Sequence, residues 1–466
     1  MSSGHGQQVQ TGQHLGITVT VSELRRSEME TPAGADDVSP YQLLFTGLTL
    51  IPISFHLLMA FLVFIIFLYI LLEIHIIYDI FSEFRGNYVS LTYNSSSDFY
   101  RDVVSKCHLL HGRYFSTPWL SSPHLQTILL HLLVKTRDFS YKRELFISSD
   151  GGTIALDWLM NFDDTRFQVN GDGGVAKVVP IVIVIPGLTS DSDAPYIKHV
   201  AYKMAKHGWN VVISNHRGLG GVPLTSDCFY TAGWTEDLRE VVNHLHSTHP
   251  EAPLFAIGTS LGANILVKYL GEDGVNVPIV GAASICNPWD ILMGDRFFGR
   301  GLMQRFYNRV LANALKDVAR LHRVVYARIG DWEGIEKARS VGEFNKYTGR
   351  ITGNFETVDA FHRWASSVHL VSNVRVPLVC INAIDDPVCT NEAIPWDECR
   401  MNKNIVLATT QHGGHNAFFE GMSGKNLWWV RAIEEYFSVL HSSLLMNKKT
   451  GHVVNAQGIQ AGPAKV

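Results

Sequence analysis

The chain has 466 residues, of which 46% are hydrophobic and 18% charged, and its formal net charge is −4. This apolar content excludes an intrinsically disordered chain, and 39 Lys and Arg against 43 Asp and Glu leave no basic surplus for a nucleic-acid partner. The six cysteines are too scattered for a disulfide scaffold, and none has the CxxC spacing of a zinc site. The length allows one large or two ordinary domains.

The N-terminal region predicts a membrane anchor. Residues 1–42 are polar and without an apolar period, so we expect them to be disordered. Residues 43–80 contain no Lys or Arg and include an apolar run long enough to span a bilayer. The run starts too late and is too long for a signal peptide, and it has no polar face of the kind a core helix shows. We therefore expect a transmembrane anchor over residues 43–80, in which Pro52 separates a short interfacial piece from the span.

The rest of the chain predicts a connecting segment, 81–142, an α/β domain, 143–446, and a flexible polar tail, 447–466. Six apolar runs each break into a turn rich in Gly, Pro or Asn: VVPIVIVIPG, WNVVISNHRG, PLFAIGTS, IVGAASICNP, VPLVCINAIDDP and IVLATTQHGGH. Their continuous apolar character predicts strands covered on both faces, and hence a mostly parallel sheet. A long helical stretch at about 289–375 predicts a cap over this sheet.

A GxSxG sequence, Gly258 to Gly262, carries the candidate nucleophile, Ser260. It follows a predicted strand and runs directly into a predicted helix. A serine in such a turn is held in a strained backbone conformation that exposes its hydroxyl, and the helix start favours developing negative charge. An ordinary Gly-rich turn is the alternative, but the strand before and the helix after favour a nucleophile.

A serine nucleophile needs a base, and His415 is the candidate. It lies in the sequence QHGGHN, directly after the last predicted strand, where the histidine of a Ser–His–Asp hydrolase belongs. His412 is a nearby competitor. The Gly-Gly step before His415 allows the loop to swing over the sheet edge, so we prefer His415.

The base in turn needs a carboxylate that orients it. Asp385 and Asp386 end the penultimate predicted strand, and we choose Asp386, which directly precedes Pro387. Asp385 remains an open alternative, and Asp290, after the strand that follows the nucleophile, is a third candidate. The resulting chain order, with serine first, aspartate second and histidine last, is the order of the α/β-hydrolases.

The turn from Pro186 to Thr189 follows the first of the six predicted strands, where the hydrolase fold places an oxyanion donor. We therefore predict that the backbone N–H groups of Leu188 and Leu261 stabilise the oxyanion. A plain turn without that role is the alternative. His216 and Arg217, which end another strand, are interpreted as structural residues.

Several of these motifs together resemble a known family. PWLSSPHLQTI, NHRGLGG, GTSLGAN, NAIDDP and HGGH occur in the order found in the membrane-anchored α/β-hydrolase-4 family, which includes abhydrolase domain-containing proteins 1, 2, 3 and 15. The resemblance covers residues 113–437. It implies a single-pass anchor, hydrolysis of phospholipids or acylglycerols, and a triad of Ser260, Asp386 and His415. The turn PGLTSDSD departs from the family's usual Thr-Gly, so the resemblance supports the oxyanion donors less than the triad.

The sequence therefore predicts a membrane-bound serine hydrolase that cleaves carboxylic esters of lipids without a metal or cofactor. An acyltransferase that passes the acyl group to an alcohol is one alternative, although no HxxxxD acyltransferase signature occurs. A non-catalytic membrane scaffold is the other. Lipid and bilayer are the expected partners, and no obligate protein partner is evident. In the cap, the apolar side of residues 301–325 either packs as core or forms part of an acyl groove or membrane contact.

The membrane orientation depends on few charges. Arg25 and Arg26 lie well before the apolar run and Arg85 lies close after it, so the charge balance is nearly a tie. Partly from the family resemblance, we expect a type II signal anchor in the endoplasmic reticulum or another endomembrane. Asn94, in the glycosylation sequon Asn-Ser-Ser, would then face the lumen.

Overall fold

The computed structural model describes residues 39–72, 86–134, 138–162 and 178–443. The chain divides into two compact units, Met1–Ile66 and Phe67–Val466. The segment predicted to be disordered, up to residue 38, and the predicted tail, 447–466, lie outside the described residues.

Two helices lie in the region of the predicted anchor: α1 (Pro40–Leu50), which begins within the segment predicted to be disordered, and α2 (Ile53–Leu71). Residues 73–80 of the predicted anchor lie outside the described residues. Pro52 lies between the two helices, and α1 begins at a cap in which the Ser39 hydroxyl accepts a hydrogen bond from the N–H of Tyr41 at 3.4 Å. Helix α2 has 19 residues and no Asp, Glu, Lys or Arg. Within the described part of the chain, it is the one helix long and apolar enough to cross a membrane.

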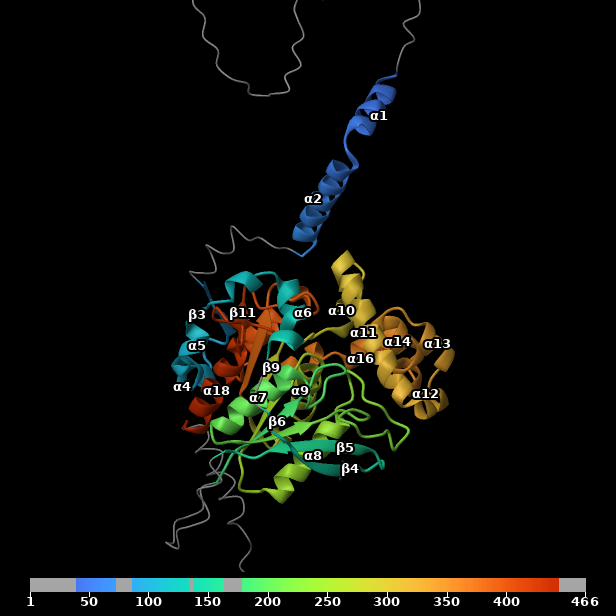
Figure 1. The fold of residues 1–466 in the computed structure, drawn as a ribbon. Coiled ribbons are helices and arrows are strands. Elements are labelled where there is room, and N and C mark those ends of the chain that lie inside the picture. The colour runs from blue at the N-terminus through green and yellow to red at the C-terminus, as the bar shows by residue number, and fades with distance from the viewer. Residues whose placement is uncertain (1–38, 73–85, 135–137, 163–177, 444–466) are drawn as a thin grey trace, which may run out of the picture. The chain divides into compact units, whose positions relative to one another are not determined.

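A nine-stranded sheet forms the centre of the second unit (Figure 1). From one edge to the other its strands are β2 (Ser90–Tyr93), β11 (Ile405–Thr410), β10 (Leu378–Ala383), β9 (Ile279–Ile285), β8 (Leu254–Thr259), β6 (Ile181–Ile185), β7 (Asn210–Ser214), β5 (Thr153–Leu159) and β4 (Lys142–Ile147). The six strands from β11 to β7 run parallel, whereas β2, β5 and β4 are antiparallel to their neighbours. These six parallel strands are the six apolar runs, so the predicted mostly parallel sheet is confirmed.

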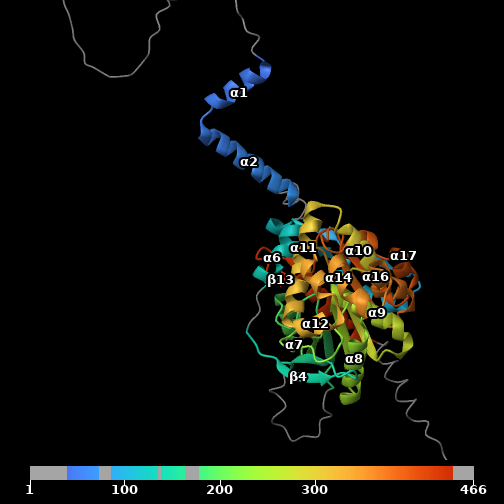
Figure 2. The same ribbon diagram turned by 90° about the vertical axis from the view of Figure 1, so that its right-hand side faces the viewer.

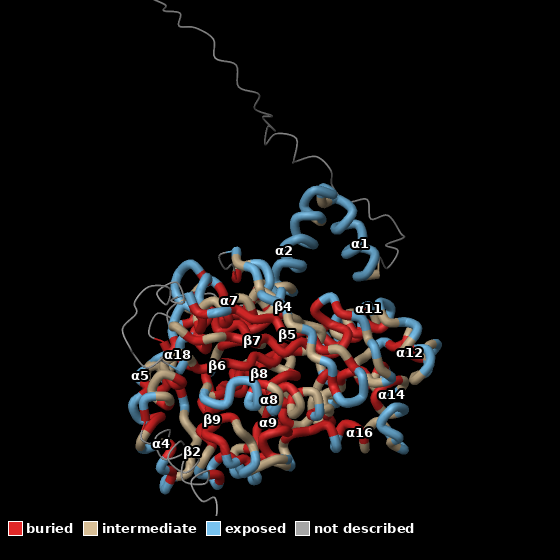
Figure 3. Tube along the Cα trace, turned by 90° about the horizontal axis from the view of Figure 1, so that it is seen from below, coloured by how far each residue is buried: buried red, intermediate tan, exposed pale blue. Residues whose placement is uncertain are grey.

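Successive side chains of each strand point to opposite faces of the sheet, and an apolar core covers each face. In β6, Val182 and Val184 belong to one apolar core, and Ile181 and Ile183 belong to another. The first core includes α7 (Pro195–Lys206) and α18 (Trp428–His441), and the second includes α8 (Glu236–Thr248) and α9 (Leu261–Asp273). Figure 3 shows the central strands β6, β7, β8 and β9 buried between exposed outer segments. Helices on both faces of a mostly parallel sheet give the three-layer α/β architecture expected of the predicted hydrolase fold.

Most of the predicted cap region is helical. Its helices are α10 (Ile291–Phe297), α11 (Leu302–Leu321), α12 (Arg323–Ile329), α13 (Trp332–Lys337), α14 (Val341–Tyr347), α15 (Gly349–Thr352) and α16 (Val358–Ala365). They gather on one side of the sheet in Figure 1, and this side faces the viewer in Figure 2. A small apolar core of their own contains Leu315, Tyr326 and Phe344, together with Phe229 from the loop before α8.

The segment predicted as a connection, 81–142, is part of the folded unit wherever it is described. Strand β2 pairs with β11, with Leu91 opposite Ala408, and so extends the central sheet at its edge. The other strands and α-helices of this segment are β1 (Asn87–Tyr88), α4 (Asp98–Asp102), α5 (His108–His111), β3 (Arg113–Tyr114) and α6 (Pro123–Leu133), and two 3-10 helices cover Val104–Lys106 and Pro118–Leu120. Near the C-terminal end lie α17 (Trp396–Met401), β12 (Phe419–Glu420) and β13 (Asn426–Leu427).

The direction of the parallel strands places the candidate residues together. Ser260, Asp386 and His415 follow the carboxyl ends of β8, β10 and β11, respectively. Carboxyl ends of parallel strands lie at one edge of a sheet, which is where α/β proteins bind their ligands. The order of the sheet therefore brings three distant parts of the sequence to one site.

Candidate active site

Ser260 lies in the turn between β8 and α9, with φ 53° and ψ −118°. This positive φ is strained for a residue with a Cβ, and the turn is the strained strand-to-helix turn that exposes a serine hydroxyl. The flanking glycines permit it. A Cβ on Gly258 would lie 2.5 Å from the carbonyl oxygen of Gly262, and a Cβ on Gly262 would collide with the carbonyl oxygens of Ile185 and Pro186.

His415 lies in the loop after β11, and its Nε2 is 2.9 Å from Oγ of Ser260. Its side chain is largely buried, with 13% exposed. Gly414, immediately before it, has φ 57°, and a Cβ there would lie 2.8 Å from the carbonyl oxygen of Pro123. The Gly-Gly step therefore allows this loop to pass close to α6, and the structure brings His415 rather than His412 to the serine.

Asp386 lies on the other side of the His415 imidazole. Its Oδ2 is 2.9 Å and its Oδ1 is 3.2 Å from Nδ1 of His415. Oδ1 also accepts hydrogen bonds from the backbone N–H groups of Val388, at 2.8 Å, and Cys389, at 2.9 Å. The carboxylate is fully buried, and these N–H donors stabilise its negative charge. An Nδ1–H donated to Asp386 leaves Nε2 free to accept the Ser260 proton.

Asp385 faces a different histidine. Its Oδ2 is 3.3 Å from Nδ1 of His412, and its Oδ1 accepts a hydrogen bond from the N–H of Gly414 at 3.0 Å. Burial raises the pKa of Asp385, although His412 and the Gly414 N–H oppose this shift. The two adjacent aspartates thus contact two different histidines. The third candidate acid, Asp290, instead caps α10 by accepting a hydrogen bond from the N–H of Met293 at 2.9 Å.

The predicted oxyanion donors lie beside Ser260. A Cβ on Gly187 would lie 3.2 Å from Cβ of Ser260, so the turn that contains Leu188 approaches the serine closely. Leu261 is the first residue of α9, where a backbone N–H has no intrahelical acceptor. For the N–H of Leu188, no acceptor is found among the described residues. Both N–H groups can therefore donate to a substrate oxygen.

One group of three side chains in the described part of the chain could offer close metal ligands: Cys286, Asp386 and His415. Burial raises the pKa of the Cys286 thiol well above its usual value, and the charge of Asp386 adds to this. A metal would need the thiolate, which burial disfavours here, and it would compete with Ser260 for His415. The chemistry of this group fits a hydrogen-bonded base better than a metal site.

Thr127 of α6 is a site residue that the sequence did not single out. Its Oγ1 accepts a hydrogen bond from the backbone N–H of His415 at 3.0 Å and donates one to the carbonyl oxygen of Pro123 at 2.7 Å. It lies within the motif PWLSSPHLQTI, so the motif itself was the available signal. No local pattern in the sequence indicates a contact between residues 288 positions apart.

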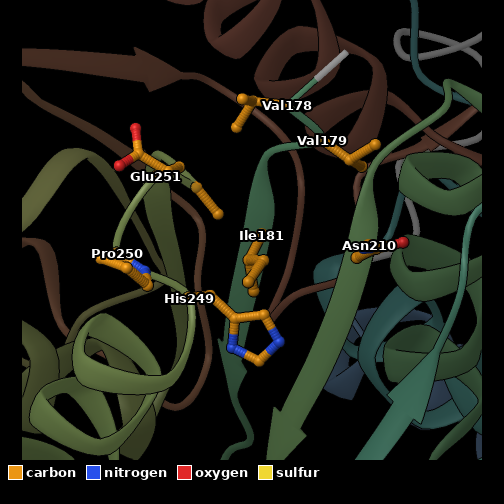
Figure 4. Close-up of a pocket in the computed structure, with 8 residues that line it drawn as sticks. Val178, Val179, Ile181, Asn210, His249, Pro250 and Glu251 are labelled. Atoms are coloured by element: carbon orange, nitrogen blue, oxygen red, sulfur yellow. The ribbon is translucent and has the colours of Figure 1, made fainter. Parts of the chain in front are cut away.

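A separate cavity of about 260 Å³ lies elsewhere on the second unit (Figure 4). Ile181, at the start of β6, and Asn210, at the start of β7, line it together with His249 and Glu251. These are the amino ends of parallel strands, whereas Ser260 follows a carboxyl end. The residues that line the cavity include no serine or cysteine. The cavity is therefore separate from the candidate active site, which lies at the opposite edge of the sheet.

Comparison with known proteins places the chain in a family. Residues 176–421 match the family described as "Serine aminopeptidase, S33" (Hydrolase_4). The chain is 34% identical to the embryogenesis-associated protein EMB8 of Picea glauca over 74% of this chain and 76% of that protein. It is 31% identical to phospholipase ABHD3 of Homo sapiens, with coverage of 70% and 78%. It is 28% identical to medium-chain fatty acid ethyl ester synthase/esterase 2 of Saccharomyces cerevisiae, with coverage of 71% and 86%.

The residues matched by the family model, 176–421, include the six parallel strands and all three candidate residues. The family resemblance expected from the sequence motifs is confirmed. The chain therefore belongs to the Hydrolase_4 family of α/β-hydrolases, alongside the abhydrolase domain-containing proteins, and is a serine-type carboxylic ester hydrolase.

Proposed function

We propose that the protein hydrolyses carboxylic esters of lipids, phospholipids or acylglycerols, through a triad of Ser260, His415 and Asp386. The observation that carries this proposal is the continuous chain of contacts from Ser260 Oγ to His415 Nε2, at 2.9 Å, and from His415 Nδ1 to Asp386, at 2.9 Å. The site thus contains a nucleophile, a base and an orienting carboxylate. The N–H groups of Leu188 and Leu261, which have no acceptor among the described residues, lie beside them, so the site has every group that acyl transfer needs.

In the acylation step, Oγ of Ser260 attacks the ester carbonyl while Nε2 of His415 takes its proton. Asp386 holds the imidazole in the orientation and tautomer that this transfer requires, and it stabilises the imidazolium. The carbonyl oxygen becomes an oxyanion that accepts hydrogen bonds from the N–H groups of Leu188 and Leu261. The tetrahedral intermediate then collapses, and His415 returns the proton to the departing alcohol.

In the deacylation step, His415 takes a proton from a water molecule as the water oxygen attacks the carbonyl of acyl-Ser260. His415 then returns the proton to Oγ of Ser260 as the acyl–oxygen bond breaks, which releases the free acid and restores the enzyme. A second candidate function replaces this water with an alcohol and yields a new ester. The name of the yeast relative, an ester synthase/esterase, supports acyl transfer to an alcohol as this second candidate. Measuring free acid against new ester over a series of ethanol concentrations separates the two, because acyl transfer requires the ester to dominate as ethanol rises.

The lipid class is supported by the name of the human relative, a phospholipase. To test it, wild-type protein and Ser260→Ala are incubated with vesicles of phosphatidylcholine and, separately, of monoacylglycerol. We expect wild-type protein to release fatty acid from at least one of them and Ser260→Ala to release none above background. If wild-type protein cleaves soluble esters but neither lipid, the lipid assignment fails although the esterase chemistry stands.

We also propose that α2 anchors the enzyme in a membrane as a single-pass, type II segment. Its 19 residues, most of them apolar, suffice for a span, and the tether would keep the enzyme close to a concentrated lipid pool. Protease treatment of sealed microsomes tests the orientation, since protection of the hydrolase domain is expected and its digestion would contradict it. A glycosidase-sensitive mass shift absent from Asn94→Gln would support it. The amide of Asn94 donates to the carbonyl oxygen of Met401 at 3.0 Å, so a glycan must attach before that contact forms.

The family assignment argues against the non-catalytic scaffold that the sequence alone also allowed. A fluorophosphonate, which reacts with activated serines, distinguishes it from an enzyme. We expect Ser260 of the folded wild-type protein to displace the fluoride, so that the peptide containing Ser260 gains the mass of the probe less HF. The absence of labelling in folded protein would favour the scaffold.

A further inference from the structure

The turn that presents Leu188 is held by side chains on both sides of that residue. The carbonyl oxygen of Pro186 accepts a hydrogen bond from Nε2 of His216 at 2.9 Å. The N–H of Thr189 donates to the hydroxyl of Tyr230 at 3.1 Å. These two contacts fix the backbone immediately before and after the Gly187–Leu188 step.

His216 and Tyr230 form one packed unit. Their rings are stacked, with centroids 4.5 Å apart and an interplanar angle of 10°, and both residues are buried. A carbonyl oxygen can only accept, so Nε2 of His216 carries the hydrogen. Burial lowers the pKa of His216 and raises the pKa of Tyr230, so both rings are neutral at pH 7. The pair therefore offers one fixed donor and one fixed acceptor to the turn.

The turn needs such support because its conformation is strained. Thr189 has φ 56°, in the left-handed region that a residue with a branched Cβ rarely adopts. A third side chain adds to the support, since the N–H of Gly187 donates to the hydroxyl of Tyr196 at 3.1 Å. Of the N–H groups of Gly187, Leu188 and Thr189, two are thus engaged within the protein, and that of Leu188 remains available.

We propose that the stacked pair of His216 and Tyr230 positions the Leu188 N–H as an oxyanion donor. This inference rests on the proposed function, because it assigns a role within that mechanism. Neither ring is assigned a contact with the substrate, so both are positioning residues. A donor aimed before reaction at the place where charge develops requires no reorganisation in the transition state, which is why a rigid support matters.

Tyr230→Phe tests the acceptor half of the pair. It keeps the stacked ring and removes only the hydroxyl that accepts from Thr189. The matched control is Tyr269→Phe, which removes a buried hydroxyl on α9 that has no hydrogen-bond partner among the described residues. For a soluble ester we expect Tyr230→Phe to lower kcat about 10-fold with KM nearly unchanged, and Tyr269→Phe to leave both unchanged.

A thionoester provides the readout that a merely structural role would not change. Its C=S sulfur is a weak hydrogen-bond acceptor, so it gains little from an oxyanion donor. In Tyr230→Phe we expect kcat for the oxoester to fall more than kcat for the matching thionoester. Equal losses on the two substrates, or wild-type kcat for the oxoester in folded Tyr230→Phe, would overturn the proposal.

His216 provides a second, independent pair of variants, which also covers the case in which Tyr230→Phe does not fold. His216→Gln can return an N–H to Pro186, whereas His216→Leu cannot. We expect the ratio of kcat for the oxoester to kcat for the thionoester to fall in His216→Leu and to recover in part in His216→Gln. An identical ratio in the two folded variants would contradict the proposal. Ser260→Ala is measured in the same series. If it retains wild-type activity, the proposed function has failed, which is distinct from failure of the positioning role.

Discussion

The hydroxyl of Thr127 accepts a hydrogen bond from the backbone N–H of His415 at 3.0 Å. Thr127 belongs to α6, in a segment that the sequence presented as a connection to the anchor. His124, one turn earlier in α6, contacts the hydroxyl of Tyr307 in α11 at 3.2 Å through its Nδ1. Helix α6 therefore lies between the loop that carries the candidate base and a helix of the cap.

Thr127→Val should weaken catalysis by releasing this loop. Valine keeps the shape of threonine but cannot accept the His415 N–H, so the imidazole loses one constraint on its position. We expect kcat to fall about 10-fold, with KM nearly unchanged, because small misplacements of a catalytic group have large effects on rate. Thr127→Ser keeps the hydroxyl and should retain most of the activity. Equal kcat in the valine and serine variants, both folded, would remove Thr127 from the supporting structure.

The two adjacent aspartates should differ strongly in their effect on rate. Asp386→Asn should lower kcat by roughly 1,000-fold or more, because the amide no longer stabilises the His415 imidazolium and favours the wrong tautomer. Asp385→Asn should cost about 10-fold or less, since its Oδ1 can still accept the Gly414 N–H. Steady-state kinetics on a soluble ester checks both. The reverse order would move the orienting role to Asp385.

The sequence predicted those parts of the molecule that depend on local patterns. Six apolar runs marked the parallel strands, and the strand–GxSxG–helix context marked Ser260. The roles of Thr127 and Tyr230 were not predictable, because each depends on a contact between elements distant in the chain. Strand β2 was not predicted either, because its four residues are too few to show a clear alternation of apolar and polar side chains. His216 was interpreted as structural, and its contact with Pro186 shows which turn it supports.

Helix α11 should matter more for lipid in vesicles than for soluble ester. Leu315 packs into the core of the cap, but Phe306 is 51% and Val310 is 47% exposed. The apolar side predicted from the sequence is therefore only partly core. We expect Phe306→Ser with Val310→Ser to reduce hydrolysis of long-chain vesicle lipid several-fold while activity on a short-chain soluble ester remains.

Val275→Ser is the control for this double variant, because Val275 is an apolar, 81% exposed residue in the 3-10 helix Gly274–Asn276, which follows the end of α9 remote from Ser260. It should change neither activity. If the α11 variant loses both activities equally, or loses only stability, its exposed side chains have no special role at the lipid surface.

His199 of α7 should make the folded protein sensitive to acid. Burial lowers its pKa from 6.5 to about 4, and Lys203 contributes to this shift. As the pH falls below 6.5, His199 binds a proton in the unfolded chain but not yet in the folded protein. The contribution of neutral His199 to the free energy of unfolding is therefore present above pH 6.5 and is lost progressively towards pH 4. Between pH 7 and pH 5 this amounts to about 2 kcal/mol of the free energy of unfolding.

Denaturant unfolding at the two pH values measures this contribution. His199→Phe should lose less stability between pH 7 and pH 5 than wild-type protein does. His246→Gln, at an exposed histidine of α8, should behave as wild type. An unchanged pH dependence in His199→Phe would assign the acid sensitivity to other groups.

The most direct test of the central claim is the rate of hydrolysis of a soluble short-chain ester by Ser260→Ala. Ser284→Ala serves as the matched control, since Ser284 lies on the adjacent strand β9 and contributes a buried hydroxyl outside the proposed mechanism. Without the nucleophile no acyl-enzyme can form, so we expect kcat/KM to fall roughly 10⁴-fold or more in folded Ser260→Ala and to stay near wild type in Ser284→Ala. Retention of most activity by Ser260→Ala would contradict the account.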